Sequence, residues 1–175
     1  MTDSIQHTAT WPTTIGAVCI VVGGLTLFGG CLSLTGMSEI EQLHTAVSFG
    51  DGELNDEVRE SLIASAPPGW ILSTSSVCII LFAVTLIAMG ISILQRNLKA
   101  VNQLKWWSTL YIAFSLALVT INWAPRMDLV QADSTVQALF MTHIMISLPL
   151  YLALPIFLLI WLNRSQVRNE LTLWR

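Results

Sequence analysis

Long runs of apolar residues alternate with short polar segments along this chain. Four runs lack Asp, Glu, Lys and Arg and are long enough to cross a bilayer as helices, at residues 11–36, 70–94, 106–123 and 144–162. The bilayer core offers the backbone no hydrogen-bond partner, and no alternating apolar–polar pattern predicts a barrel. The pattern therefore predicts an all-α integral membrane protein, a single four-transmembrane-helix bundle over residues 1–175.

The connections between these spans are expected at 37–69, 95–105 and 124–143, followed by a tail at 163–175. The connection 37–69 predicts two short amphipathic helices. The first opens with the capping-box pair Ser38 and Glu41, and the second is capped by Asn55 and ends before Pro67-Pro68-Gly69. In 124–143, Ser134 and Gln137 form another capping box, so the fourth helix is expected to start there and to enter the membrane later.

Basic residues predict the orientation of the bundle. Most of the eight Lys and Arg residues lie in the connection 95–105 or in the tail, whereas 37–69 and 124–143 hold one each. The positive-inside rule then places both termini in the cytoplasm of a cell, with a bacterial inner membrane as the expected location. Tryptophans lie at the expected membrane boundaries, as an aromatic belt requires, namely Trp11, Trp70, Trp106, Trp107, Trp123 and Trp161.

The first span carries small residues at helical spacing along one face. Lipid does not reward the burial of large side chains against one another, so transmembrane helices associate where small side chains let two backbones approach. A matching series in the second span can meet this face across an antiparallel pair. The predicted packing residues are Gly16, Cys19, Gly23, Thr26, Gly30 and Ser33 in the first span and Ser76, Ala83 and Gly90 in the second. The alternative is a chance row in a span rich in small residues.

The fourth span contains Pro149 and Pro155, each of which removes a backbone hydrogen bond. A kink that lets a long helix follow its neighbours is the favoured interpretation. The alternative is a broken helix that lines a transport pathway.

Composition narrows the chemistry further. Only 11% of the residues are charged, far below a soluble domain, and no basic patch indicates nucleic-acid binding. The cysteines Cys19, Cys31 and Cys78 lie inside spans without metal-ligand spacing. No nucleophile, phosphate-binding or dinucleotide motif is present, and the spans lack the carboxylates of a proton relay. No catalytic residue and no cofactor are therefore predicted.

Two histidines of the predicted outer side, His44 and His143, are candidates for binding haem or a metal if the fold brings them together. Neither has a second ligand one helical turn away, so two ordinary interfacial side chains are the favoured interpretation.

These patterns predict a non-enzymatic accessory, scaffold or assembly subunit that acts through helix–helix contacts. Its expected partners are membrane lipid and either another membrane protein or a second copy of itself. One alternative is a homo-oligomeric transporter or pore lined by the fourth span. Another is a haem- or metal-binding protein that uses His44 and His143.

Overall fold

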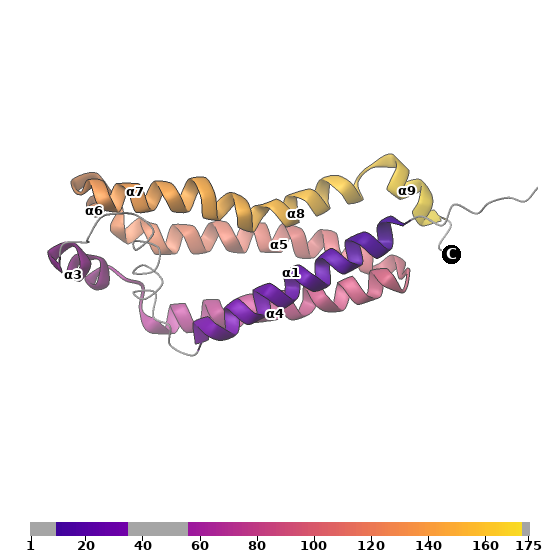
Figure 1. The fold of residues 1–175 in the computed structure, drawn as a ribbon, viewed down its shortest axis with the longest axis horizontal. Coiled ribbons are helices and arrows are strands. Elements are labelled where there is room, and N and C mark those ends of the chain that lie inside the picture. Colours follow the sequence, from indigo (N-terminus) through magenta and orange to yellow (C-terminus); the bar gives the residue numbers. More distant parts are fainter. Residues whose placement is uncertain (1–9, 35–55, 173–175) are drawn as a thin grey trace, which may run out of the picture.

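The computed structural model describes residues 10–34 and 56–172, and every regular element in these ranges is helical (Figure 1). In chain order the elements are α1 (Trp11–Leu34), α3 (Asp56–Ala64), α4 (Gly69–Leu94), α5 (Leu98–Trp123), the 3₁₀ turn η1 (Ala124–Arg126), α6 (Met127–Ala132), α7 (Ser134–Thr142), the π-helical turn η2 (His143–Ser147), α8 (Leu148–Leu162) and α9 (Ser165–Leu171). Four rods are long and apolar enough to cross a membrane: α1, α4, α5 with η1 and α6, and α7 with η2 and α8. The predicted all-α class with four such helices is thereby confirmed for these ranges.

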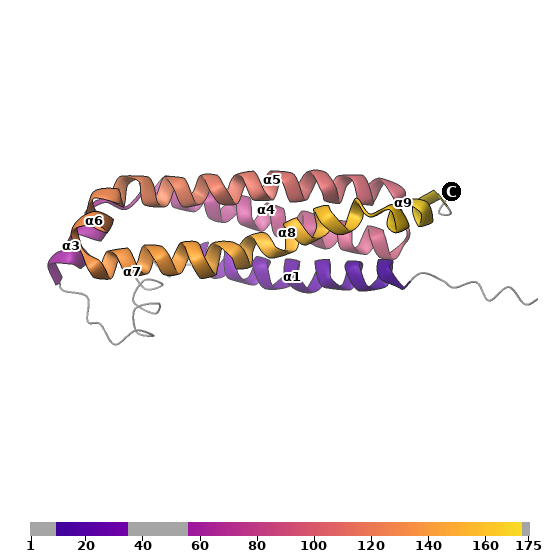
Figure 2. The same ribbon diagram turned by 90° about the horizontal axis from the view of Figure 1, so that it is seen from above.

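The four rods form two antiparallel pairs. In one pair α1 packs along most of α4, and in the other α5 packs along α8 (Figures 1 and 2). The start of α1 lies beside α9 at one end of the molecule, which we call the terminal end. Helices α3 and α6 lie at the opposite end, which we call the α3 end.

The turn between α4 and α5 is shorter than the predicted connection 95–105. Only residues 95–97 lie between the two helices, because α5 begins at Leu98. Asn97 caps it, with its Oδ1 accepting the Lys99 backbone N–H at 3.0 Å. Arg96 adopts the left-handed conformation with φ 58°, which reverses the chain in few residues. The polar residues in 95–105 show where the apolar sequence is interrupted. Helix α5 nevertheless includes most of them, because it begins at Leu98.

The connection 124–143 is also mostly helical, and the fourth rod begins at Ser134 as expected. Its cap differs from the predicted Ser134–Gln137 box. The Asp133 carboxylate accepts the backbone N–H groups of Thr135 at 2.7 Å and Val136 at 3.1 Å. Asp133 has extended backbone angles directly before the helix, so its side chain reaches the free N–H groups one residue earlier than predicted.

Within the connection 37–69 the structure describes one helix, α3, at Asp56–Ala64. The first predicted helix, from Ser38, lies outside the described residues, as does Asn55. Helix α4 begins at Gly69, one residue before the predicted span.

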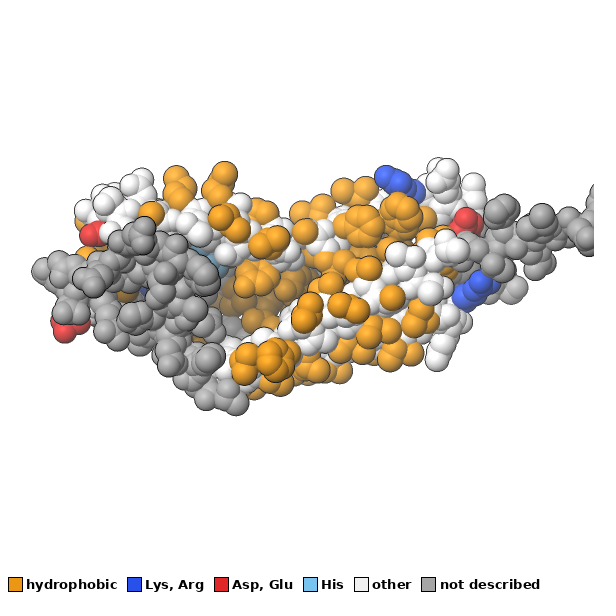
Figure 3. Space-filling view, in the orientation of Figure 1, with side chains coloured by type: hydrophobic (Ala, Val, Ile, Leu, Met, Phe, Trp, Pro, Cys, Tyr) orange, Lys and Arg blue, Asp and Glu red, His pale blue; other side chains and the backbone are white. Residues whose placement is uncertain are grey.

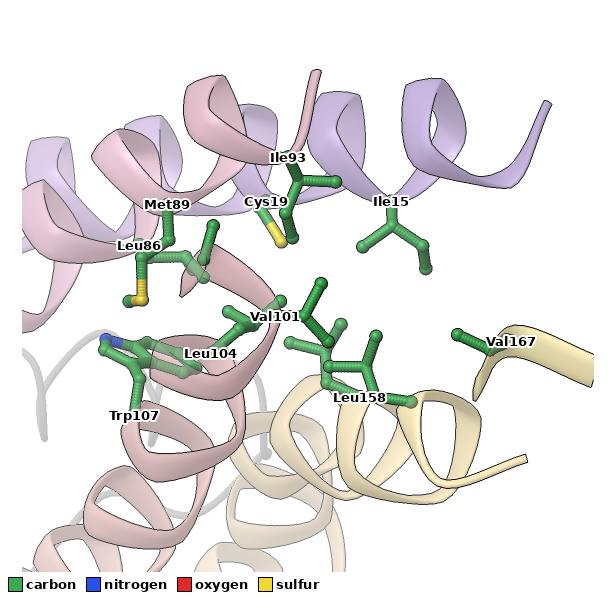
Figure 4. Packing of buried hydrophobic residues seen from close by; sticks show 12 residues of the cluster. Ile15, Cys19, Leu86, Met89, Ile93, Val101, Leu104, Trp107, Leu158 and Val167 are labelled. Carbon is green, nitrogen blue, oxygen red and sulfur yellow. The ribbon is translucent and has the colours of Figure 1, made fainter. Parts of the chain in front are cut away.

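Buried apolar side chains gather at both ends of the bundle. At the terminal end, all four rods and α9 contribute to one cluster that includes Ile15, Cys19, Leu86, Met89, Ile93, Val101, Leu104, Trp107, Leu158 and Val167 (Figure 4). At the α3 end, a smaller cluster of Leu62, Trp123, Val130 and Val136 joins α3 to the α5–α8 pair. Within the described residues this second cluster takes no side chain from α1 or α4. The two helix pairs are therefore held together mainly at the terminal end.

The Asp133 cap leads to a pH-dependent prediction. The N–H groups of Val136 and Thr135 hold the pKa of the Asp133 carboxyl below its usual value. Its contribution to stability is thus present above the unfolded pKa of about 3.9 and is lost as the pH falls through the lower folded pKa. We expect Asp133→Ala to lower the thermal unfolding midpoint at neutral pH, and we expect its difference from the wild type to shrink as the pH falls below about 4.

Asp133→Asn is the matched control, because an Asn side chain caps a helix without titrating. It should unfold near the wild-type temperature at neutral pH. Equal midpoints for the wild type and Asp133→Ala at every pH would contradict the proposed role of the cap.

Candidate functional site

The interface between α1 and α4 brings the two predicted small-residue series together. Gly16, Cys19, Gly23 and Gly30 are buried on α1, and Ser76, Ala83 and Gly90 are buried on α4. A Cβ atom built on Gly16 would lie 2.9 Å from the Gly90 carbonyl oxygen, and one built on Gly90 would lie 2.9 Å from the Gly16 carbonyl oxygen. The two backbones are therefore in direct contact at this point.

The polar members of the seam behave differently from one another. The hydroxyl groups of Ser33 and Ser76 share a hydrogen bond of 2.9 Å between α1 and α4. Thr26 instead donates its hydroxyl hydrogen to the Val22 carbonyl of its own helix, at 2.9 Å. Of these two polar residues of α1, Ser33 is the one that bonds to α4.

An aromatic stripe on α5 faces α4. The indole Nε1 of Trp107 donates to the Phe82 carbonyl at 2.9 Å, and the Phe82 ring lies 5.4 Å from the Tyr111 ring and 5.2 Å from the Phe114 ring. Trp107, which is predicted at the membrane boundary, is buried within the bundle. The earlier start of α5 places Trp107 well inside the helix, where its ring packs against α4.

A second stripe on α5 is polar and faces the fourth rod. Ser108, Ser115 and Asn122 recur at seven-residue spacing, and both serines are buried. The Trp123 ring lies 6.0 Å from the His143 ring, and Tyr111 is within electrostatic range of Tyr151. This antiparallel register places Asn122 level with the start of η2. The Asn122 Oδ1 atom is buried without a hydrogen-bond partner among the described residues.

The fourth rod is irregular directly opposite Asn122. Over His143–Ser147 the helix widens to a π turn, in which the Leu148 N–H bonds to the His143 carbonyl. Pro149 follows and has no N–H. The Ile144 carbonyl thereby loses both donors that could reach it within the helix. Figure 1 shows that the axis of the rod bends between the labels of α7 and α8, and the buried Pro155 lies further along α8.

The α3 end contains a buried arginine, which is the single basic residue of the connection 124–143. Arg126 is only 5% exposed, and its Nη2 donates to the Leu62 carbonyl of α3 at 3.5 Å. The guanidinium group therefore links α3 to the end of α5. Arg126 directly follows Pro125 in the turn that ends a predicted span. This is the sequence feature that could have indicated its burial.

The terminal end is tied by polar contacts that the sequence did not predict. Trp11 Nε1 donates to the Glu170 carboxylate, which connects the start of α1 to α9. Lys105 Nζ donates to Asn163 Oδ1 at 2.8 Å, between α5 and the end of α8. The partners in each pair are far apart in sequence, so no local sequence pattern predicts either contact.

The proposed histidine pair is not tested, because His44 lies outside the described residues. His143 is half-buried beside Trp123. Across residues 10–34 and 56–172, no three His, Cys, Asp or Glu side chains gather as metal ligands would. Cys19 is buried, Cys78 is half-buried and Cys31 is exposed, each as a free thiol.

The backbone contact between α1 and α4 predicts different effects of Gly→Ala substitutions on the two sides of α1. Gly16→Ala or Gly90→Ala should lower stability by about 1–3 kcal/mol, because the new methyl group meets a backbone carbonyl. Gly24→Ala should be neutral or stabilise by up to about 1 kcal/mol, because no atom lies within 4 Å of its Cβ position and Ala favours a helix. Reversible unfolding in micelles measures both. Equal effects at Gly16 and Gly24 would mean that the seam does not control packing.

The described residues thus provide a close-packed helix pair, α1 with α4, and a second pair, α5 with α8, whose interface contains unpaired hydrogen-bond acceptors. Compared with models of known protein families, with curated proteins and with solved structures, the chain shows no significant match.

Proposed function

We propose that this protein is a non-enzymatic accessory or scaffold subunit of a membrane complex, and that α1 is the helix that receives the partner. The carrying observation is that α1 has two faces of small residues and that α4 fills only one of them. The other face consists of Ala17, Gly24 and Cys31, again at seven-residue spacing. All three are exposed.

The open face has the shape that a second transmembrane helix requires. No atom lies within 4 Å of a Cβ position on Gly24, whereas the neighbouring Gly23 has no such room. Large exposed side chains, Val21 and Phe28, line one side of this row. A shallow notch beside a ridge lets a partner helix approach closely, and close packing drives association in lipid.

The exposure of the fourth rod also supports a role in assembly. Only 11% of its most apolar stretch is buried within the chain, compared with 28% for α1 and for α4. Lipid covers such a surface in isolation, and a neighbouring subunit can cover it equally well. We further propose that the terminal end faces the cytoplasm, because Lys99, Lys105, Arg164 and Arg168 lie there.

Purification of the tagged protein from its native membrane tests this function. We expect a second protein to co-purify at fixed stoichiometry with the wild type. Gly24→Leu should remove that protein while leaving the unfolding midpoint of the isolated subunit close to the wild-type value, because the new side chain fills the notch and touches nothing within the chain.

Gly29→Leu is the matched control, since Gly29 is equally open but lies off the Ala17–Gly24–Cys31 row. It should retain the partner. A wild-type protein that is isolated alone as a monomer would contradict the proposal, and so would equal loss of the partner in both variants.

Transport is the second candidate function, and the π turn followed by two prolines favours it. Interrupted helices form substrate sites in many transporters, and π turns are frequent at functional sites. If an oligomer of this protein conducts solutes along its fourth rod, Pro149→Ala with Pro155→Ala should reduce flux into liposomes severalfold. Unchanged flux would exclude that rod as the pathway.

A further inference from the structure

A buried side-chain acceptor without a partner and a backbone carbonyl without its helical donors lie at the same level of α5 and the fourth rod. One is Asn122 Oδ1, which is buried without a partner among the described residues. The other is the Ile144 carbonyl, whose two possible helical donors are removed by the Leu148–His143 bond and by Pro149. Buried acceptors of this kind cost free energy until a donor satisfies them. The site therefore calls for a molecule that donates hydrogen bonds.

The charged groups near this site are already engaged. Arg126 contacts the Leu62 carbonyl on the α3 side, and the Asp133 carboxylate accepts the first N–H groups of α7. Between Ser134 and Leu162 the rod contains no Asp, Glu, Lys or Arg. A charged headgroup would lose its hydration without gaining a counter-charge. The ligand that fits is thus uncharged.

An apolar region adjoins the acceptors toward the middle of the molecule. The half-buried rings of Phe82, Tyr111 and Phe114 lie where α4 meets α5, and Tyr151 of α8 approaches Tyr111. Figure 3 shows a hollow lined by hydrophobic side chains between the fourth rod and the α1–α4 pair. Phe82 and Tyr111 pack against the terminal-end cluster, and the hollow between the rods gives room beside that cluster for a hydrocarbon chain.

We infer that this region binds an uncharged lipid with a hydroxyl headgroup, of the monoacylglycerol class. Its two hydroxyl groups supply one donor each for Asn122 Oδ1 and the Ile144 carbonyl, and its single acyl chain occupies the hollow. A glycerol headgroup without phosphate lies at the level of the ester carbonyls, just inside the membrane boundary. That depth matches the sequence prediction for Asn122, which directly precedes Trp123, a residue predicted at the membrane boundary. This site is on α5 and the fourth rod and is independent of the proposed partner face on α1.

Thermal unfolding in phosphatidylcholine nanodiscs, followed by tryptophan fluorescence, tests the inference with monooleoylglycerol as the probe. We expect the probe to raise the unfolding midpoint of the wild type. Asn122→Leu should unfold at or above the wild-type temperature without the probe, because it removes an unpaired buried acceptor. It should bind the probe about three- to tenfold more weakly, as the loss of one hydrogen bond requires.

Asn102→Leu is the matched control, because Asn102 is an exposed residue of the same helix. It should respond to the probe like the wild type. Pro149→Ala restores a backbone N–H beside the Ile144 carbonyl and should also weaken binding, which tests the second acceptor without changing Asn122.

Methyl oleate, which has the same chain and no hydroxyl group, should not raise the midpoint. An equal rise with methyl oleate would overturn the inference, because the hollow would then bind any hydrocarbon chain. No response of the wild type to monooleoylglycerol would also overturn it, since water alone would then satisfy the two acceptors. An unchanged response of Asn122→Leu would place the lipid elsewhere.

Discussion

The contact of the α1 and α4 backbones at Gly16 and Gly90 is the interaction on which the rest of the bundle depends. In lipid, two apolar helices gain little by burying large side chains, so they need many close van der Waals contacts along their length. Gly16, Gly23 and Gly30 provide them because they have no side chain, and the residues that alternate with them on this face, Cys19, Thr26 and Ser33, have small ones. Ile15 and Cys19 are then held against α5 and α8 in the terminal-end cluster. A wider α1–α4 spacing would move both residues out of that cluster.

The second pair is assembled by different chemistry. Helix α5 presents aromatic rings to α4 and the polar stripe of Ser108, Ser115 and Asn122 to the fourth rod. Small hydroxyl side chains permit close approach as glycine does, and they bond within their own helix, as Ser108 does to the Leu104 carbonyl at 2.9 Å. The Asn122 side chain, in contrast, has an Oδ1 atom without a hydrogen-bond partner among the described residues. The interface between α5 and the fourth rod is therefore closely packed at Pro155 and Leu158, whereas near the π turn a hydrogen-bond acceptor lacks a donor.

This change along the molecule explains why its two ends differ. At the terminal end, side chains of all four rods interlock, and polar pairs such as Lys105 with Asn163 close the surface. At the α3 end, Trp123 and Val136 pack with α3, while α1 and α4 take no part in that cluster. Within the described residues the two pairs are therefore joined mainly at the terminal end. The features that suggest binding, Asn122, His143 and the π turn, all lie toward the α3 end.

The amino-acid sequence by itself determined the class of the protein, its four apolar rods and the small faces of α1 and α4. These properties follow from local composition and spacing. In a bilayer without water the backbone must form helices to satisfy its hydrogen bonds, and glycine allows two helices to approach closely. It also indicated an irregular fourth rod through Pro149 and Pro155. Helix ends were less predictable: α5 starts at Leu98 because a helix continues beyond the point where polar residues appear.

Only the tertiary structure decided which faces are used and which remain free. That α4 covers Gly23 and leaves Gly24 open depends on the rotation of one helix about another, which no spacing rule specifies. The burial of Arg126 against Leu62, and the missing donors of Asn122 and Ile144, likewise arise between segments distant in sequence. Local patterns report what a residue prefers, whereas its partners depend on how the four rods come together.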